Sequence, residues 1–370
     1  MGPIKIGFYT APKHTLPHPE THIENPERLE AMYRHVKEHA LVDGVVEEMC
    51  SYYSTREASR EEIGWVHGYY DQLVDRVQQA CMKEDSYLCV ADDGDPDGCT
   101  YAVESSVTDA KRAAGVVLDL VDCVCGSEEP TTKAMACVRP PGHHATGSTS
   151  LGFCIFNSVA IAVRYAMKKY DGIERVLLVD FDLHNGNGTA EIFWESSDVC
   201  VVDIHEKTQV YEPPEFVPND ANAVGGGKGH GYTVNVPLEH ASGHHSVVRV
   251  MEEIVKPVAE RIKPNLVMVS AGFDGHRDDP FGMLCMVEET YEYLGGFLSS
   301  IADTYCDGKI LFVLEGGYNP DALGKSVVAT LQGVVSQTPA AHSGPPPSAG
   351  DLQSDSIIDT VKRIHSIGNS

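Results

Sequence analysis

Short apolar runs that alternate with helical segments constrain the fold of this chain more than any other feature. The runs are rich in Val, Ile and Leu and lie at 5–10, 134–140, 175–182, 199–205, 265–274 and 309–318. Such runs are typical of strands buried on both faces, and their alternation with helices predicts a parallel sheet. A first helix is expected from Pro26, and further helices at 61–83, 103–120, 156–169, 187–195, 243–262 (interrupted by Pro257), 287–303 and 320–335.

The chain has 370 residues, which are enough for one substantial core, and we expect a single domain over 1–335. Residues 336–370 begin with a Pro- and Ser-rich stretch that is typical of a linker, and a short helix is expected at 351–366.

The acidic charge narrows the range of partners. The chain carries 54 acidic and 28 basic side chains, a formal net charge of -26. This balance argues against direct binding of nucleic acid or of an anionic membrane, and it favours a cationic partner or solubility alone. The eleven cysteines form no C-x-x-C pair, and no signal peptide is visible. We therefore expect an intracellular protein in a reducing compartment, cytoplasmic, nuclear or both.

Polar side chains gather where the predicted strands end. Asp182 and His184 lie two residues apart as one strand leaves the sheet, so both can point the same way. An isolated D-x-H pair more often caps a turn, but Asp274 ends another strand, and parallel strands bring their carboxyl ends to one edge. An Asp-His-Asp set leaves one tetrahedral position open, which is typical of catalytic zinc. Iron(II) or cobalt is also compatible with these ligands.

Six motifs carry a resemblance to a known family. They are "HPETHIENPERL" (18–29), "RPPGHHA" (139–145), "GFCIFN" (152–157), "VDFDLHNGNG" (179–188), "SAGFDGHRDDPFG" (270–282) and "LEGGY" (314–318). Their order resembles the histone deacetylase and acetylpolyamine amidohydrolase superfamily over about residues 1–335, closest to the class II zinc-dependent histone deacetylases. The resemblance implies an arginase-like α/β fold, with a central parallel sheet of about eight strands flanked by helices, and a zinc-dependent deacetylase as the domain at 1–335.

The resemblance also implies the metals. It makes Asp182, His184 and Asp274 the ligands of one zinc ion, and it places a potassium ion near Asp180, Asp182 and His184. Arginase-type members of this fold hold two metal ions with extra aspartates. Gly186 and His276 stand at the two positions where those aspartates would be, so we expect one divalent ion.

The catalytic roles follow from the same resemblance. His144 would be the general base and later the acid, oriented by Asn187, and His143 would be its electrostatic partner, paired with Asp180. Tyr318 would donate a hydrogen bond to the oxyanion.

Substrate contacts are implied for Gly152, Phe153, Gly316, Gly317 and Asp95, the last in the acidic loop 92–98. A second aromatic wall is expected within 205–220, from either Tyr211 or Phe216, and Arg28 resembles an arginine that lines an acetate exit channel.

The activity implied is hydrolysis of the acetamide of N-ε-acetyl-lysine in histones or other proteins, with release of acetate, and hydroxamate-type inhibitors are expected to bind the zinc. An acetylpolyamine amidohydrolase is the first alternative, because small cationic substrates suit an acidic chain. A catalytically silent acetyl-lysine reader or scaffold is the second.

Overall fold

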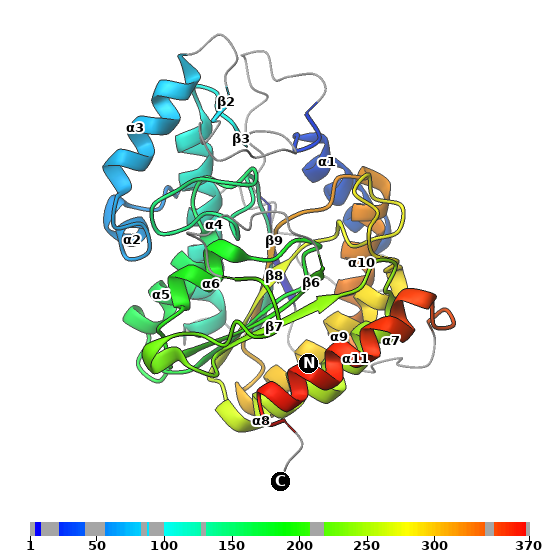
Figure 1. Cartoon of the computed structure of the whole chain (residues 1–370). Helices are drawn as coiled ribbons and strands as arrows, with labels where there is room; N and C mark the ends of the chain where they lie inside the picture. The colour runs from blue at the N-terminus through cyan, green and yellow to red at the C-terminus, as the bar shows by residue number, and fades with distance from the viewer. Residues whose placement is uncertain are drawn as a thin grey trace.

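A seven-stranded parallel sheet occupies the centre of the molecule (Figure 1). The computed structural model describes residues 4–8, 22–40, 56–82, 87–88, 100–126, 131–207, 218–336 and 344–367. In spatial order the strands are β1 (Ile4–Phe8), β4 (Lys133–Cys137), β9 (Ile310–Leu314), β8 (Leu266–Ala271), β5 (Val176–Asp180), β6 (Val199–Glu206) and β7 (Thr233–Leu238). The expected α/β class with a parallel sheet is confirmed, with seven strands in the described residues where about eight were expected.

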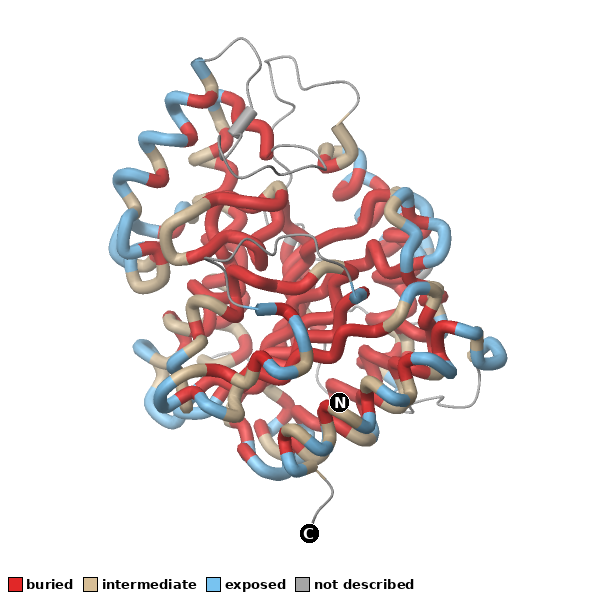
Figure 2. The backbone as a smooth tube through the Cα atoms, in the orientation of Figure 1, coloured by how far each residue is buried: buried red, intermediate tan, exposed pale blue. Residues whose placement is uncertain are grey.

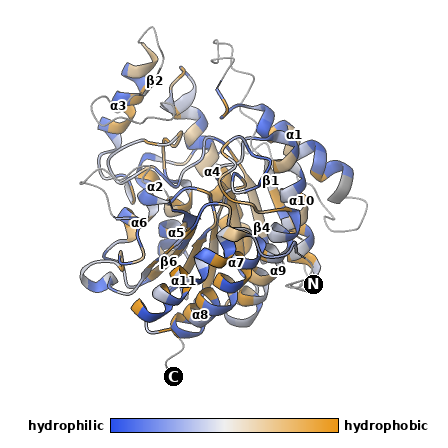
Figure 3. Cartoon of the chain, turned by 45° about the vertical axis from the view of Figure 1, so that its right-hand side comes forward, coloured by the Kyte–Doolittle hydropathy of each residue, from blue (hydrophilic) through white to orange (hydrophobic). Residues whose placement is uncertain are grey.

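The central strands are apolar because both of their faces are buried. In β5, Leu177 and Val179 belong to the hydrophobic cluster on one face, whereas Val176 and Leu178 belong to the cluster on the other. All four side chains are fully buried. Alternate residues of a strand point to opposite faces, so a continuous apolar run is the pattern that a sheet between two helical layers requires. Figure 2 shows this buried interior, and Figure 3 shows that apolar residues concentrate there.

Helices cover both faces. α4 (Ser106–Cys125) and α5 (Ser158–Lys169) pack on one face, and α9 (Glu288–Tyr305) and α10 (Pro320–Ser336) pack on the other. None of the helices in the described ranges is both long and apolar enough to cross a membrane. Further elements, which are shorter, include α1 (Glu27–His35), η1 (Val36–Ala40), β2 (Tyr87–Leu88), β3 (Thr100–Tyr101), α6 (Asn187–Phe193) and η2 (Gly227–Gly229).

The order of the strands reverses next to β5. The chain runs outward from β5 to β6 and β7, then returns to place β8 on the opposite side of β5 and β9 beside β4. Asp180, the last residue of β5, is in register with Ser270 of β8 and Asp203 of β6. In parallel sheets, ligands bind outside the carboxyl ends of the strands at such a switch point. The loops after β5 and β8 are therefore the expected location of a site.

Two helix predictions need correction. A single helix over 61–83 is wrong, because α2 (Arg60–Gly64) and α3 (Tyr70–Cys81) are separate. The chain leaves the helical path between them and buries His67, whose Nε2 accepts a hydrogen bond from the Asn157 N–H at 2.9 Å. Burial lowers the pKa of His67 to about 4, so the ring is neutral and can accept this bond.

The segment 243–262 is also more continuous than expected. α7 (His244–Val250) passes through the π-helical turn η3 (Met251–Val255) into α8 (Lys256–Ile262). Pro257 has no N–H, and its ring would collide with a carbonyl one turn earlier in a regular α-helix. The wider π turn just before Pro257 accommodates the proline, so the helix is locally distorted there and continues beyond it.

The chain after residue 344 packs against the domain through α11 (Ala349–Ile364). Buried Asp351 in the first turn accepts hydrogen bonds from the Gly243 N–H at 2.8 Å, the Ser246 N–H at 3.0 Å and the Ser246 hydroxyl at 2.7 Å. It also completes a capping box with Ser348. One carboxylate thus joins the start of α11 to the start of α7.

Replacing Asp351 with alanine is expected to lower the free energy of unfolding by about 2–4 kcal/mol, because several buried donors lose their acceptor and α11 loses its cap. Urea unfolding measures the change. Asp355→Ala is the matched control, since that side chain is 38% exposed and pairs with Arg249 at the surface. Its cost should stay below about 1 kcal/mol. Equal costs for the two variants would contradict the role of Asp351.

Candidate active site

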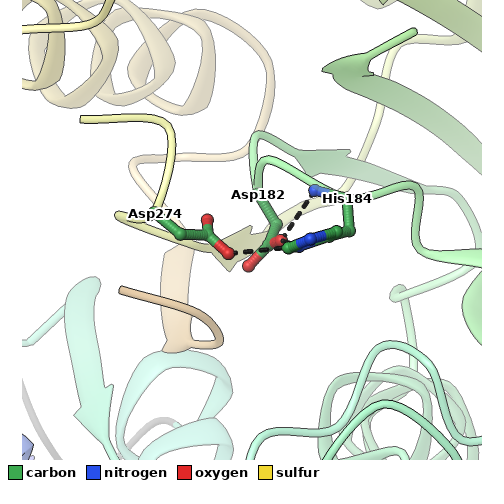
Figure 4. Close-up of side chains that lie close together, drawn as sticks. All are labelled: Asp182, His184 and Asp274. Atoms are coloured by element: carbon green, nitrogen blue, oxygen red, sulfur yellow. Dashed lines mark hydrogen bonds and ion pairs between the residues drawn. The ribbon is translucent and has the colours of Figure 1, made fainter. Parts of the chain in front are cut away.

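Three potential metal ligands meet at the switch point of the sheet. Asp182 and His184 follow β5, and Asp274 follows the neighbouring strand β8. Their ligand atoms all lie within 4.8 Å of one another. His184 Nδ1 is 3.3 Å from Asp182 Oδ1 and 3.2 Å from Asp274 Oδ2, so the imidazole nitrogen faces both carboxylates (Figure 4). The structure therefore brings together the three side chains selected from the sequence.

Backbone N–H groups hold both carboxylates in place. The Gly316 N–H donates to Asp182 Oδ2 at 2.8 Å, and the Leu183 N–H donates to Asp274 Oδ1 at 3.0 Å. Gly316 must approach closely to do so, because a Cβ at this position would lie only 2.3 Å from Asp274 Oδ2. The glycine of "LEGGY" therefore leaves room for the cluster.

The cluster has the negative charge and the oxygen and nitrogen ligand atoms that a divalent cation requires. Asp182 and Asp274 are both buried, and Asp274 Oδ2 faces the same His184 nitrogen as Asp182 Oδ1. Burial and the charge of Asp182 raise the pKa of Asp274. Burial alone would lower the pKa of His184, but the two carboxylates raise it to about 10. An Asp-His-Asp set of this kind fits zinc, whose charge would offset that of the two carboxylates.

Two adjacent imidazoles border the cluster. His143 Nδ1 is 3.0 Å from Asp180 Oδ2, and His144 Nδ1 is 2.7 Å from Asn187 Oδ1. The two rings lie 4.0 Å apart, and His143 Nε2 lies 3.8 Å from Asp182 Oδ1. In both rings a side chain from the β5–α6 region holds Nδ1, so Nε2 is the nitrogen left for chemistry.

The environments of the two rings separate their pKa values. Burial alone would lower the pKa of His143, but Asp182 and Asp180 raise it well above its ordinary value. Burial and the neighbouring His143 lower the pKa of His144 well below its ordinary value. These opposite shifts favour a proton on His143 and a neutral His144 that can accept one. Divergent pKa values in a pair of adjacent groups are typical of acid–base sites.

Two residues whose roles were not predicted from the sequence hold the histidine loop. Glu315 Oε2, directly after β9, accepts hydrogen bonds from the Gly142 N–H at 2.6 Å and the His143 N–H at 3.1 Å. Asn157 at the start of α5 donates to the Ala145 carbonyl at 3.2 Å. Both residues belong to the quoted motifs, "LEGGY" and "GFCIFN", but their partners are more than ten residues away in sequence.

Tyr318 lies beside this group, after the glycine turn that follows β9. The Arg28 guanidinium lies over its ring at 4.7 Å, and the Phe153 and Phe281 rings meet it edge-on at 5.8 and 5.4 Å. The Phe281 ring also meets the His184 ring at 5.2 Å. Phe281 was not selected from the sequence, although it belongs to the "DPFG" motif that follows Asp274.

The remaining residues selected from the sequence divide into two groups. Gly152, with φ +53°, lies against the His144 ring, since a Cβ there would be 2.3 Å from His144 Cδ2. The Gly317 carbonyl accepts a hydrogen bond from Arg28 Nε at 2.6 Å, which fixes the turn before Tyr318. The others, Asp95, Tyr211 and Phe216, lie outside the described residues.

Comparison with known proteins identifies the family. A family model described as "Histone deacetylase domain" matches residues 22–334. The chain belongs to the histone deacetylase family. It is 34% identical over 314 residues to "Histone deacetylase 6" of Caenorhabditis elegans, covering 85% of this chain and 32% of that protein. It is 37% identical over 333 residues to "Polyamine deacetylase HDAC10" of Homo sapiens, covering 88% of this chain and 47% of that protein.

A solved structure supports the same histone deacetylase fold. The "Crystal Structure of HDA15 HD domain" matches with a TM-score of 0.78 and 29% identity, covering 98% of this chain and 94% of that chain. The expected superfamily and fold are therefore confirmed. The chain spans 32% and 47% of the length of the two curated relatives named above.

Proposed function

We propose that the protein is a zinc-dependent deacetylase that hydrolyses the acetamide of N-ε-acetyl-lysine in proteins and releases acetate. One observation carries the proposal: the Asp182–His184–Asp274 cluster lies directly beside two imidazoles whose pKa values are shifted in opposite directions. Hydrolysis of an amide needs an electrophile that polarises the carbonyl and a base that activates water. A metal ion held by the cluster and the neighbouring His144 ring would supply them side by side.

Zinc is the metal that we propose for the three ligands. When bound, it would polarise the acetamide carbonyl and lower the pKa of a water molecule. One ion is proposed, because the described residues contain a single cluster with metal-binding spacing. His276, at the position where a second-metal aspartate would be, instead contacts Glu288, with its Nε2 3.4 Å from Glu288 Oε2, outside the cluster. A potassium ion near Asp180, Asp182 and His184 remains part of the proposal.

His144 would transfer the protons, and His143 would supply a fixed positive charge. With Nδ1 held by Asn187, neutral His144 presents Nε2 as the base that accepts a proton from water and later donates it to the departing lysine amine. His143, held by Asp180, would remain positively charged and stabilise the negative charge that develops nearby.

Tyr318 would stabilise the oxyanion. Burial raises the pKa of its hydroxyl well above the ordinary value, so the group stays protonated and can donate a hydrogen bond. Phe153 and Phe281, whose rings flank Tyr318, would contact the aliphatic chain that carries the acetamide, and Gly152, Gly316 and Gly317 would leave space around it.

Hydrolysis of acetylpolyamines is the second candidate, because one relative is named a polyamine deacetylase. Both substrates present an acetamide on an aliphatic chain, so the aromatic walls suit either. A silent acetyl-lysine reader is less well supported, since the ligand set, both imidazoles and Tyr318 are all in place. We further propose that the catalytic domain covers 1–335, that 336–370 forms a linker and terminal helix, and that the protein acts in the cytoplasm or the nucleus.

The decisive experiment combines metal analysis with a substrate panel. Purified protein should contain about one zinc ion per chain, and a chelator should abolish turnover that one equivalent of zinc restores. Faster turnover of an acetyl-lysine peptide than of an acetylated polyamine supports the proposal, and the reverse order supports the second candidate. A zinc-loaded protein without turnover on either substrate would leave only the reader.

A further inference from the structure

Asp279 joins the two loops that carry the aromatic residues of the site. It is buried, with 6% of its surface exposed. Its Oδ2 accepts hydrogen bonds from the Tyr318 N–H at 2.6 Å and the Asn319 N–H at 3.0 Å, and its Oδ1 accepts one from the Phe281 N–H at 3.1 Å. A single carboxylate thus binds the backbone of the glycine turn after β9 and that of the loop after β8.

These contacts fix two side chains that touch each other. The Phe281 and Tyr318 rings meet edge-on at 5.4 Å, and Phe281 continues to the His184 ring at 5.2 Å. The loop that contains Asp279 also contains Asp274, a proposed metal ligand. The position of the Tyr318 hydroxyl relative to the metal ligands therefore depends on a connection that runs through Asp279.

Burial of this carboxylate is costly. Burial and the charge of Asp274 raise the pKa of Asp279 to about 7, whereas the backbone N–H donors lower it. A buried carboxylate is retained only when hydrogen bonds compensate it, and an exposed turn of the same shape would need no such group. The cost of burying Asp279 indicates that the relative position of the two loops it joins must be fixed.

We propose that Asp279 is a positioning residue, which acts through Tyr318 by holding its hydroxyl in the place where it donates to the oxyanion. This inference rests on the proposed function, in which Tyr318 is the oxyanion donor. Displacing a catalytic group by about 1 Å costs on the order of 100-fold in rate, so small movements of the turn have measurable effects.

The test is a double-mutant cycle on the zinc-loaded full chain, with Asp279→Asn, Tyr318→Phe and the double variant assayed on an acetyl-lysine peptide. Asparagine retains the size of the side chain but cannot accept all three N–H bonds. We expect Asp279→Asn to lower kcat roughly 10- to 100-fold with KM within about threefold of wild type. In the Tyr318→Phe background the same change should cost less than about twofold, because the hydroxyl that it positions is gone.

Asp278→Asn is the matched control, since this neighbouring carboxylate is 62% exposed, and it should leave kcat unchanged. Zinc content and the unfolding midpoint are measured for every variant. If Asp279→Asn does not accumulate as folded protein, Asp279→Glu, which moves the carboxylate by one methylene, replaces it in the cycle. Failure of both variants to fold would overturn the proposal, because Asp279 would then be required for the fold.

The outcomes separate the two proposals. An equal loss from Asp279→Asn in both backgrounds would show that Asp279 does not act through Tyr318, and the proposed function would stand. An active wild type whose Tyr318→Phe variant is equally active overturns the positioning role of Asp279 and the oxyanion role of Tyr318, while zinc-dependent deacetylation stands. An inactive zinc-loaded wild type overturns both proposals.

Discussion

Replacing Asp274 with asparagine is expected to abolish zinc binding and turnover while leaving the metal-free protein at least as stable as the metal-free wild type. The first effect follows from the loss of one of three ligands. A catalytic metal contributes several kcal/mol to the transition state, which corresponds to roughly 10³- to 10⁴-fold in rate.

The effect on stability has the opposite sign. Without metal, the Asp274 carboxylate is buried close to Asp182, and the polar partner of its Oδ2 is the His184 ring nitrogen at 3.2 Å, which also faces Asp182 Oδ1 at 3.3 Å. An asparagine retains the acceptor for the Leu183 N–H and replaces the second oxygen with a donor. One imidazole thus faces two buried carboxylates, so removal of one of the two negative charges favours the metal-free fold.

Metal content by mass spectrometry and thermal unfolding with and without zinc measure both effects of Asp274→Asn. Zinc should raise the unfolding temperature of the wild type and of Asp278→Asn, but not that of Asp274→Asn. A variant that still binds one equivalent of zinc, or that is less stable than the wild type without metal, would contradict this account of the cluster.

The second large effect is expected at the histidine pair. His144→Gln should lower kcat by about 10²- to 10⁴-fold, the usual contribution of a general acid–base group, while zinc content stays at one per chain. Glutamine approximates the size of the ring, and its amide can still bond Asn187, but it cannot accept a proton near neutral pH. The loss should therefore appear in turnover and not in metal binding.

The control for His144→Gln is His240→Gln, because that imidazole is 71% exposed and lies outside the pair. It should retain full activity. If His144→Gln kept turnover within tenfold of the wild type, another group would be the base. If it lost zinc as well, the separation between metal ligands and proton-transfer groups would be wrong.

The sequence was sufficient for the parts of the site that lie at strand ends. Asp182, His184 and Asp274 follow long apolar runs, and parallel pairing brings the ends of such runs to one edge whatever the exact strand order. The alternation of burial along β5 is likewise visible in an unbroken Val–Leu run. The apolar run and the polar residue that ends it are adjacent in the sequence, so both features can be predicted from a short segment.

The parts that were missed depend on contacts between distant residues. Glu315 bonds the Gly142 N–H across 173 residues, and no local pattern reveals which buried carboxylate will meet which backbone group. Asp279 and Phe281 were missed for the same reason, since their partner Tyr318 lies in the turn after another strand, β9. The break between α2 and α3 was not predicted, because the tertiary burial of His67 outweighs the helical periodicity of the sequence there.

The placement of β8 beside β5 has a consequence for biosynthesis. The Leu183 N–H reaches the Asp274 carboxylate across 91 residues, and two further strands are made in between. Until β8 and the residues after it have emerged from the ribosome, a nascent chain therefore carries Asp182 and His184 without Asp274, the third proposed ligand. If zinc binds as proposed, its three ligands come together only after β8 has paired with β5, so metal binding would be a late step of folding.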